Sequence, residues 1–178
     1  RLFEWFRDNQ ERVKNRPDGK VMRYAINSNL VPKDEIMDRL IELSHYVPWL
    51  EVYTSCESFG KHAEYIRDGF IWDKWIGNLN RLVTEANVKR THIMMTINGL
   101  CLSSITEFMD EMIDIKRQYG HRYPTMTLNL LRFPSFQSPL VLSDELRTKY
   151  KDNLSQWLVK HKGYNYLHEH EINHVLRL

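Results

Sequence analysis

The sequence predicts an α/β fold, either a partial (βα) barrel or an open parallel sheet, built from about four βα units with flanking helices. The first observation is the alternation of strand-like and helix-like segments along the 178 residues. Segments that alternate at this length are typical of parallel strands joined by right-handed crossovers. The second is an apolar content of 42%, which suits one domain with a sizeable core. Four such units do not close an eight-stranded barrel.

The first part of the chain predicts a helix, a strand and a second helix. Residues 2–15 carry apolar side chains at mostly helical spacing, and turn residues follow them. Residues 20–26 form a short apolar run that ends in Asn and Ser, which is typical of a buried strand. Pro32 opens a helix that Pro48 ends, and its apolar stripe includes Ile36.

The middle part of the chain repeats this pattern. Strand-forming residues at 50–53 lead into a polar cluster and then into residues 61–87, which we interpret as one long helix or a broken pair. The apolar face of that segment includes Trp75, so we expect its ring to be buried. Residues 91–100 predict a third strand, which also ends in polar residues followed by glycine.

The last part adds one more strand and two helical segments. Ser103 or Ser104 is expected to cap a helix over residues 105–120, in which apolar residues repeat with a period of 3.6. We interpret Phe133 and Phe136 as core residues, although they can also line a pocket. The remaining elements are a strand over residues 125–133, a helix over residues 143–160 that Ser143 caps, a break at Lys162 and Gly163, and a helical segment over residues 166–178.

Small polar residues end three of the four expected strands. Parallel strands share one carboxyl edge, so we expect these side chains to gather on one rim, where α/β proteins place ligands. The alternative is that they are ordinary turn residues, with Ser55 and Ser58 capping the next helix. The three clusters are Asn27, Ser28 and Asn29, then Thr54, Ser55 and Glu57, and then Thr96 and Asn98.

Arg67 lies on the helix after the second strand, about three turns beyond Ser55. Its guanidinium could reach back over the rim and bind a ligand carboxylate through two hydrogen bonds. The alternative is a solvent-exposed arginine that pairs with Glu64 or Asp68.

The composition argues against several classes of function. Twenty-five Lys and Arg residues face twenty-three Asp and Glu residues, and the formal charge of +2 requires neither nucleic acid nor a membrane as a partner. No apolar run reaches the roughly 18 residues that span a bilayer. Cys56 and Cys101 are the only cysteines, which favours a reducing cytoplasm, and each is expected to be a buried apolar residue. No glycine-rich dinucleotide motif, P-loop or G-x-S-x-G elbow is present.

Residues 170–174, HEINH, match the zinc motif H-E-x-x-H. On a helix, His170 and His174 would share one face and could bind zinc, with Glu171 as general base. Only four residues follow the motif, however, and a third protein ligand is expected downstream. Apolar residues around the motif fit an ordinary amphipathic helix, which we favour, and a zinc metallohydrolase is the less favoured alternative.

Five stretches of the chain, in this order and spacing, match a known pattern: AINSNL at 25–30, YTSCESFGKHAEYIRDG at 53–69, WIGNLNRL at 75–82, MMTINGLCLSSITEFMDEM at 94–112 and LNLLRFP at 128–134. They resemble the third to sixth strands, with the helices between them, of a radical S-adenosylmethionine (SAM) enzyme, a partial six-stranded (βα) barrel. The likeness is to uncharacterised, often phage-encoded, members with a twitch/SPASM-like tail. It implies that residues 1–160 are the later part of the barrel and that residues 161–178 begin a C-terminal helical tail.

The resemblance also implies a set of SAM-binding residues. Ser55 corresponds to the residue that touches the methionyl part of SAM. Arg67 corresponds to the residue that binds the SAM carboxylate. The other positions lie near the ribose or the substrate, or along the adenine, and they are Glu57, Asn27, Asn98 and the backbone at Leu131.

The family hallmark C-x-x-x-C-x-x-C, which holds a four-iron–four-sulfur cluster, is absent, and the spacing of Cys56 and Cys101 does not replace it. We therefore expect this chain to be a fragment that is inactive alone, with the cluster ligands outside it. The resemblance implies that the complete protein, given electrons by a reductant protein, cleaves SAM to a 5′-deoxyadenosyl radical that acts on an unknown substrate. The alternative from another class is a non-catalytic (βα) binding or scaffold module.

Overall fold

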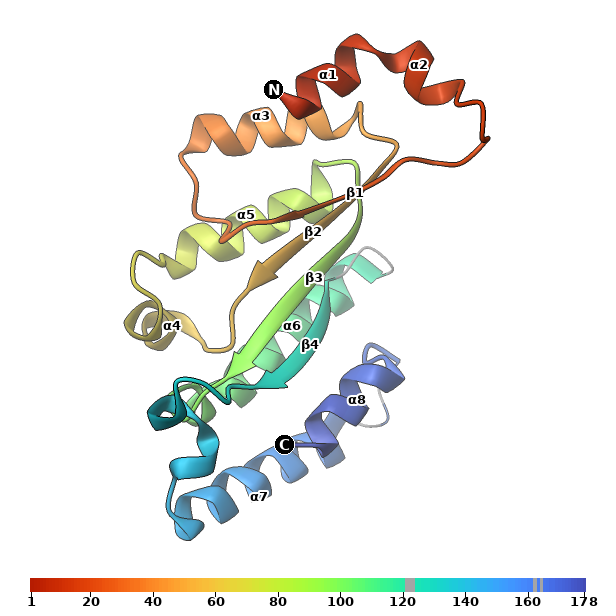
Figure 1. Ribbon diagram of the computed structural model, residues 1–178. Coiled ribbons are helices and arrows are strands. Elements are labelled where there is room, and N and C mark those ends of the chain that lie inside the picture. The colour runs from red at the N-terminus through yellow and green to blue at the C-terminus, as the bar shows by residue number, and fades with distance from the viewer. Residues whose placement is uncertain (121–123, 162, 164) are drawn as a thin grey trace.

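The protein has an α/β fold with an open, all-parallel sheet of four strands, as the sequence predicts (Figure 1). The computed structural model describes residues 1–120, 124–161, 163 and 165–178. The strands lie side by side in chain order, so each crossover connects neighbouring strands. They are β1 (Arg23–Asn27), β2 (Trp49–Ser55), β3 (Val88–Ile97) and β4 (Thr125–Leu130).

Helices occupy the connections and both ends of the described chain. They are α1 (Leu2–Asp8), α2 (Gln10–Lys14), α3 (Asp34–Ser44), α4 (Gly60–Ile66), α5 (Trp72–Thr84), α6 (Ile105–Tyr119), α7 (Asp144–His161) and α8 (Glu169–Leu176). Short 3₁₀ helices η1 (Cys101–Ser103), η3 (Ser135–Gln137) and η4 (Pro139–Val141) follow the ends of β3 and β4. Among the described residues, no helix is long and apolar enough to cross a membrane.

The helices α3, α5 and α6 pack on one face of the sheet (Figure 1). Alternate side chains of the strands point into this layer, and Leu50, Val52 and Ile93 are fully buried there. The ring of Trp75 on α5 is also buried, and its Nε1 donates a hydrogen bond to Thr54 Oγ1 of β2 at 2.9 Å. This contact confirms the expected burial of Trp75 and fixes α5 across β2.

The other face of the sheet, which we call the open face, keeps its side chains half-exposed or exposed. It mixes basic, aromatic and hydroxyl side chains, unlike the apolar face beneath the helices. Parallel sheets are normally covered on both faces, so an open polar face is unusual. The open face consists of Arg23, Ala25 and Asn27 of β1, Trp49, Glu51, Tyr53 and Ser55 of β2, Arg90, His92, Met94 and Thr96 of β3, and Thr125, Thr127 and Asn129 of β4.

The outer edge of β4 is closed by α8. Side chains of α8 accept hydrogen bonds from two backbone N–H groups on the edge of β4 that pairs with no other described strand. Met126 N–H donates to Glu171 Oε1 at 2.7 Å, and Leu128 N–H donates to His174 Nδ1 at 3.3 Å. The helix α7 packs beside α6, where Trp157 Nε1 donates to Asp110 Oδ1 at 2.7 Å. An exposed strand edge invites pairing with another chain, and α8 prevents this here.

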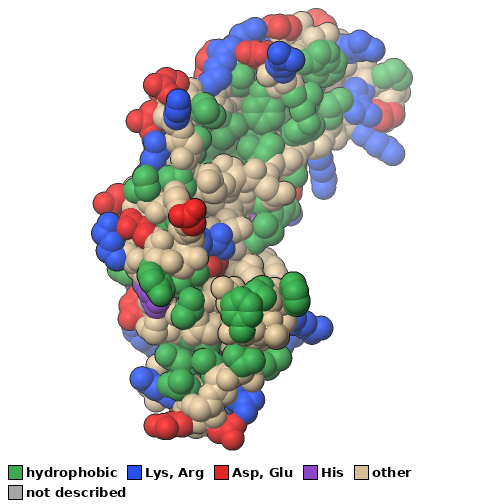
Figure 2. All heavy atoms as spheres, turned by 60° about the vertical axis from the view of Figure 1, so that its left-hand side comes forward, with side chains coloured by type: hydrophobic (Ala, Val, Ile, Leu, Met, Phe, Trp, Pro, Cys, Tyr) green, Lys and Arg blue, Asp and Glu red, His purple; other side chains and the backbone are tan. Residues whose placement is uncertain are grey.

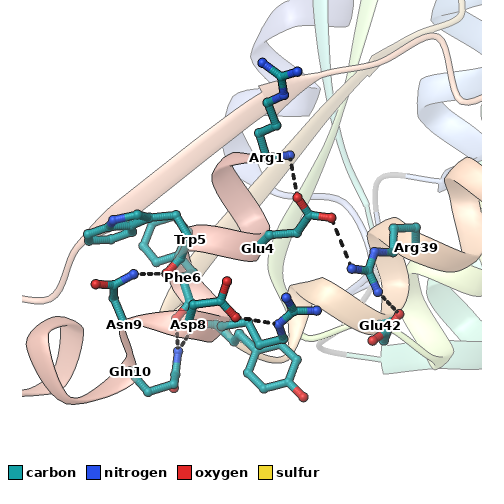
Figure 3. Close-up of polar contacts among 11 residues, drawn as sticks. Arg1, Glu4, Trp5, Phe6, Asp8, Asn9, Gln10, Arg39 and Glu42 are labelled. Carbon is teal, nitrogen blue, oxygen red and sulfur yellow. Dashed lines mark hydrogen bonds and ion pairs between the residues drawn. The ribbon is translucent and has the colours of Figure 1, made fainter.

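At the opposite side, α1 packs on α3 through a small polar network (Figure 3). Arg39 of α3 donates to Glu4 at 3.1 Å and to Glu42 at 2.6 Å. Gln10 Nε2 donates to the carbonyl of Tyr46 at 2.8 Å, which fixes the start of α2 to the loop after α3. These polar contacts surround the buried ring of Phe6, so α1 extends the helix layer beyond β1.

Several element boundaries differ from those predicted. The helix expected over residues 2–15 breaks at Asn9, whereas residues 61–87 contain the broken pair α4 and α5, which is one of the two predicted alternatives. The strand β3 begins three residues earlier than predicted, at Val88. Ile36 is 59% exposed, because the buried side of α3 is formed by its neighbour Met37 instead. Of the predicted break at Lys162 and Gly163, Lys162 lies outside the described residues.

Candidate functional site at the carboxyl rim

The polar strand ends all lie at the carboxyl edge of the sheet, as predicted, but the edge is staggered. Asn27 ends β1 in register with Tyr53, which is two residues before Ser55 at the end of β2. Ser55 pairs in register with Met94 of β3, four residues before Asn98. At about 3.3 Å per residue, Asn98 therefore lies roughly 13 Å further along the strand direction than Ser55. Asn27 and Ser55 are brought together on neighbouring strands, whereas Asn98 is not beside them.

Glu57 and Arg67 form an ion pair at the rim. Arg67 Nε donates to Glu57 Oε1 at 3.1 Å, and Nη2 makes a second, very short contact with Oε2. The Glu57 carboxylate is 3% exposed, whereas 29% of the Arg67 side chain is exposed. Because Arg67 follows the last residue of α4, the pair attaches the end of this helix to the loop after β2.

Arg67 therefore binds a carboxylate of the protein, but its partner is Glu57 and not Glu64 or Asp68, the two residues that the sequence suggested. Glu64 accepts from Lys61 Nζ at 2.7 Å and from the backbone N–H of Trp72 at 3.0 Å. Within the described residues, Arg67 Nη1 has no hydrogen-bond partner, so one edge of the guanidinium is still open to a ligand. Glu57 fixes the orientation of that edge.

Asn98 shapes the loop after β3. Its side chain is 7% exposed, and its Oδ1 accepts hydrogen bonds from the backbone N–H groups of Leu100 at 2.9 Å and Cys101 at 3.0 Å. Such a turn is a common structural use of Asn after a strand. Leu131 continues the pairing of β3 and β4 by one residue, with its N–H donating to the carbonyl of Ile97 at 2.8 Å. Asn98 and Leu131 therefore have structural roles at the rim, because Asn98 fixes the loop after β3 and Leu131 extends the pairing of β3 with β4.

A serine–histidine cluster lies beside the rim and was not predicted. Ser104 Oγ lies 2.5 Å from Ser58 Oγ and 3.0 Å from His62 Nδ1, and Ser103 Oγ lies 3.3 Å from the same nitrogen. The N-cap of α4 is Phe59, so neither Ser55 nor Ser58 caps that helix. Ser104 is the N-cap residue of α6, as expected, but its side chain makes no cap bond and contacts Ser58 instead. These residues are about 45 positions apart in the chain, and no local pattern signals such a contact.

Phe133 and Phe136 are also placed differently from the prediction. Their side chains are 86% and 74% exposed, so they are not core residues. They follow β4, in the segment that leads to the exposed residues Leu140 and Val141 of η4. Figure 2 shows hydrophobic side chains at the surface in both its upper and its lower half. The rim therefore carries apolar surface beside its polar strand ends.

The H-E-x-x-H motif is used for packing. Glu171 is buried, accepts from Lys116 Nζ at 2.6 and 2.7 Å, and also accepts from the backbone N–H groups of Met126 and His168. With four hydrogen bonds to protein groups, this carboxylate is not available as a general base. No group of three His, Cys, Asp or Glu side chains in the described part of the chain is placed to hold a metal ion.

The two cysteines are free thiols that are fully buried, as expected for small apolar residues. Cys56 Sγ donates to the carbonyl of Ser58 at 3.3 Å, and Cys101 Sγ donates to the carbonyl of Asn98 at 3.2 Å. Burial raises the pKa of each thiol to about 12. Iron is bound by thiolates, so these cysteines do not fit an iron–sulfur cluster.

Comparisons with protein-family models, with curated proteins and with solved structures found no significant match to this chain. The arrangement described above is therefore the basis for assigning a function. It offers a rim with an oriented arginine and hydroxyl and amide groups, next to an open polar face.

Proposed function

We propose that this chain is the SAM-binding later part of a radical SAM enzyme, in which residues 1–160 form one wall of a partial (βα) barrel. The observation that carries the proposal is the sequential strand order β1-β2-β3-β4, with α3, α5 and α6 on one face and a polar open face. A barrel wall has this arrangement, because its helices lie outside and its strands follow one another around the interior.

The main structural alternative for a parallel sheet is the doubly wound fold. In that fold the strand order reverses at one point, and helices cover both faces of the sheet. Neither feature is present in the described residues. The barrel is partial in this proposal, so its inner face is not filled by a closed apolar core, and the polar side chains of the open face would be available to a ligand.

The rim supports specific roles for the residues that the family resemblance points to. Arg67 Nη1 receives the carboxylate of the methionyl group, and Glu57 is the positioning residue that holds the guanidinium. Ser55 and Asn27, on adjacent strands, contribute a hydroxyl and an amide on the open-face side. Asn98 acts indirectly, through the shape of the loop after β3. The backbone at Leu131 is assigned to the adenine.

The iron–sulfur cluster would supply the electron for reductive cleavage of SAM. The thiols of this chain do not fit it, because both are buried and bonded to backbone carbonyls. The proposal therefore places the cluster ligands in another part of the complete protein. The residues of this chain contribute binding and orientation of SAM, and the substrate is not identified by the rim.

The test uses the complete gene product, purified and supplied with iron and sulfide without oxygen. The proposal predicts brown iron–sulfur absorbance and saturable binding of SAM in isothermal titration calorimetry. The substitution Arg67→Lys should weaken SAM binding by about tenfold, because a single ammonium replaces a planar fork. The matched control Arg147→Lys, on α7, should leave SAM affinity unchanged. A complete protein that holds no iron and binds no SAM would instead support a non-catalytic scaffold module.

A further inference from the structure

A hollow of about 860 Å³ lies at the amino-terminal ends of β3 and β4, and the SAM proposal does not use it. This volume is within the range of small-molecule sites in proteins. Strands β2, β3 and β4, the end of α5 and the start of α8 all contribute to its wall. We call it the His92 hollow, and its lining includes Tyr53, Arg90, His92, Thr125, Thr127 and His170.

The imidazole of His92 is fixed in this wall with one nitrogen unused. Its ring stacks on Tyr53 with centroids 4.5 Å apart, and Nδ1 lies 2.7 Å from Thr125 Oγ1. The other nitrogen, Nε2, is buried and has no hydrogen-bond partner among the described residues. Because a solvent-sized atom has almost no access to Nε2, this nitrogen is not a contact for a ligand, and His92 contributes a fixed ring to the wall of the hollow.

Positive charges dominate around the hollow. Arg90 lines it, and together with Arg23 it flanks the ring of Trp49, with guanidinium carbons 5.9 and 4.7 Å from the ring centre. In the described residues neither arginine has an ion-pair partner. The acid on this part of the open face is Glu51, which accepts from Trp49 Nε1 at 2.8 Å and from Tyr53 Oη at 3.3 Å.

We propose that the His92 hollow binds a small organic oxyanion, a carboxylate or a phosphate ester. Arg90 contacts the anionic group, and the hydroxyls of Thr125 and Thr127 and the ring of His92 lie in the same wall. Arginine suits this role because its planar fork matches both carboxylate and phosphate oxygens. Naming this ligand as the substrate rests on the proposed function, but the binding of an oxyanion here does not.

The experiment follows the imidazole nitrogens by long-range ¹H–¹⁵N NMR in protein labelled with ¹⁵N-histidine. Inorganic phosphate and succinate are added separately at constant ionic strength. We expect a saturable shift of the His92 nitrogens with at least one of the two anions, and the anion that saturates the site identifies the class. His45 is the internal control, because its ring is on the surface and lies 3.1 Å from the carbonyl of Glu85.

Two variants complete the test. Arg90→Gln should weaken anion binding by about tenfold, whereas the matched control Arg12→Gln, on the exposed side of α2, should not change it. No saturable shift with either anion, or equal affinity in the Arg90 and Arg12 variants, would overturn the inference. SAM binding is measured separately, so failure of one proposal does not decide the other.

Discussion

At the residue scale, Arg67 of the rim bonds Glu57 and keeps Nη1 without a hydrogen-bond partner among the described residues. The sequence placed Arg67 where it could bind a ligand carboxylate, and the structure adds Glu57 as a carboxylate of the protein itself. A nearly buried Glu57 requires this cation, because an isolated buried carboxylate is costly. Arg67 is therefore structural as well as available to a ligand, and a test of its function must separate the two roles.

Arg67→Ala should lower the stability of the protein, contrary to the expectation of a freely exposed arginine. It leaves the Glu57 carboxylate buried without a partner, at a cost of about 1–3 kcal/mol, since part of the guanidinium is in solvent. Urea unfolding measures this loss. The double variant Glu57→Gln/Arg67→Gln should recover part of it. Equal stability of the single variant and the wild type would show that the ion pair contributes nothing.

Lys116→Met is expected to destabilise the protein more strongly than Arg67→Ala. Lys116 and Glu171 are 0% and 1% exposed, and burial lowers the pKa of the lysine although Glu171 opposes the shift. Removal of one member of a buried pair typically costs about 3–5 kcal/mol. Lys116→Met/Glu171→Gln should be more stable than Lys116→Met alone in thermal unfolding. The reverse order would contradict the assignment of the pair.

The two thiols should not react with a maleimide reagent in the folded protein near pH 7.5. A thiol with a pKa of about 12 is almost never ionised at that pH, and both are buried. Mass spectrometry should show no label on the native protein and two labels after unfolding in urea. Rapid labelling of the native protein would mean that Cys56 or Cys101 is accessible.

At the element scale, the residues that were predicted well are those whose role is local. Periodicity and strand-forming residues place all four strands, and the apolar face of α5 correctly includes Trp75. Predictions failed where a partner far along the chain decides the outcome. The side chain of Ser104, at the N-cap of α6, bonds Ser58 and His62 instead of the helix backbone, and the start of β3 depends on the length of β2 beside it.

The packing of α5 on the sheet makes a direct prediction. Trp75 is fully buried, contacts the rings of Phe70, Trp72 and Phe108, and donates to Thr54. Trp75→Ala should therefore lower the free energy of unfolding by about 3–5 kcal/mol. Trp5→Ala, at a ring that is 37% exposed, is the control and should cost much less. Similar losses in the two variants would show that α5 is packed differently.

At the scale of the whole molecule, the sheet has one face that is sealed and one that is open. The alternation of strand and helix predicts a parallel sheet from sequence, but it cannot show that the helices lie on one side only. That depends on the handedness and order of the crossovers. The His92 hollow could not be predicted either, because Tyr53, His92 and Thr125 belong to three strands and become neighbours through register alone.

Stability should fall as the pH falls from about 7.5 to about 5. Burial lowers the pKa of His92 and His174 below the ordinary 6.5, with nearby His170 adding to the shift while Glu51 and Glu171 oppose it. Arg90 near His92 and Arg177 near His174 also lower these pKa values. The unfolded chain then binds more protons in this range, so acid favours unfolding.

Urea unfolding at several pH values measures this slope. His92→Gln/His174→Gln should make it shallower, because two of the groups whose pKa is lowered in the folded state are gone, while His161, whose pKa burial also lowers, keeps part of the slope. A stability that stays constant or rises as the pH falls through this window would contradict the burial assigned to these two rings.

The central claim is that the rim at the ends of β1 and β2 binds SAM. Hydrogen–deuterium exchange of the complete gene product, measured by mass spectrometry with and without SAM, tests it most directly. SAM should slow exchange in the segments that contain Asn27, Ser55 and Arg67, and leave α1 and α2 unchanged. Binding of SAM without slower exchange in these segments, or no binding at all, would contradict the assignment.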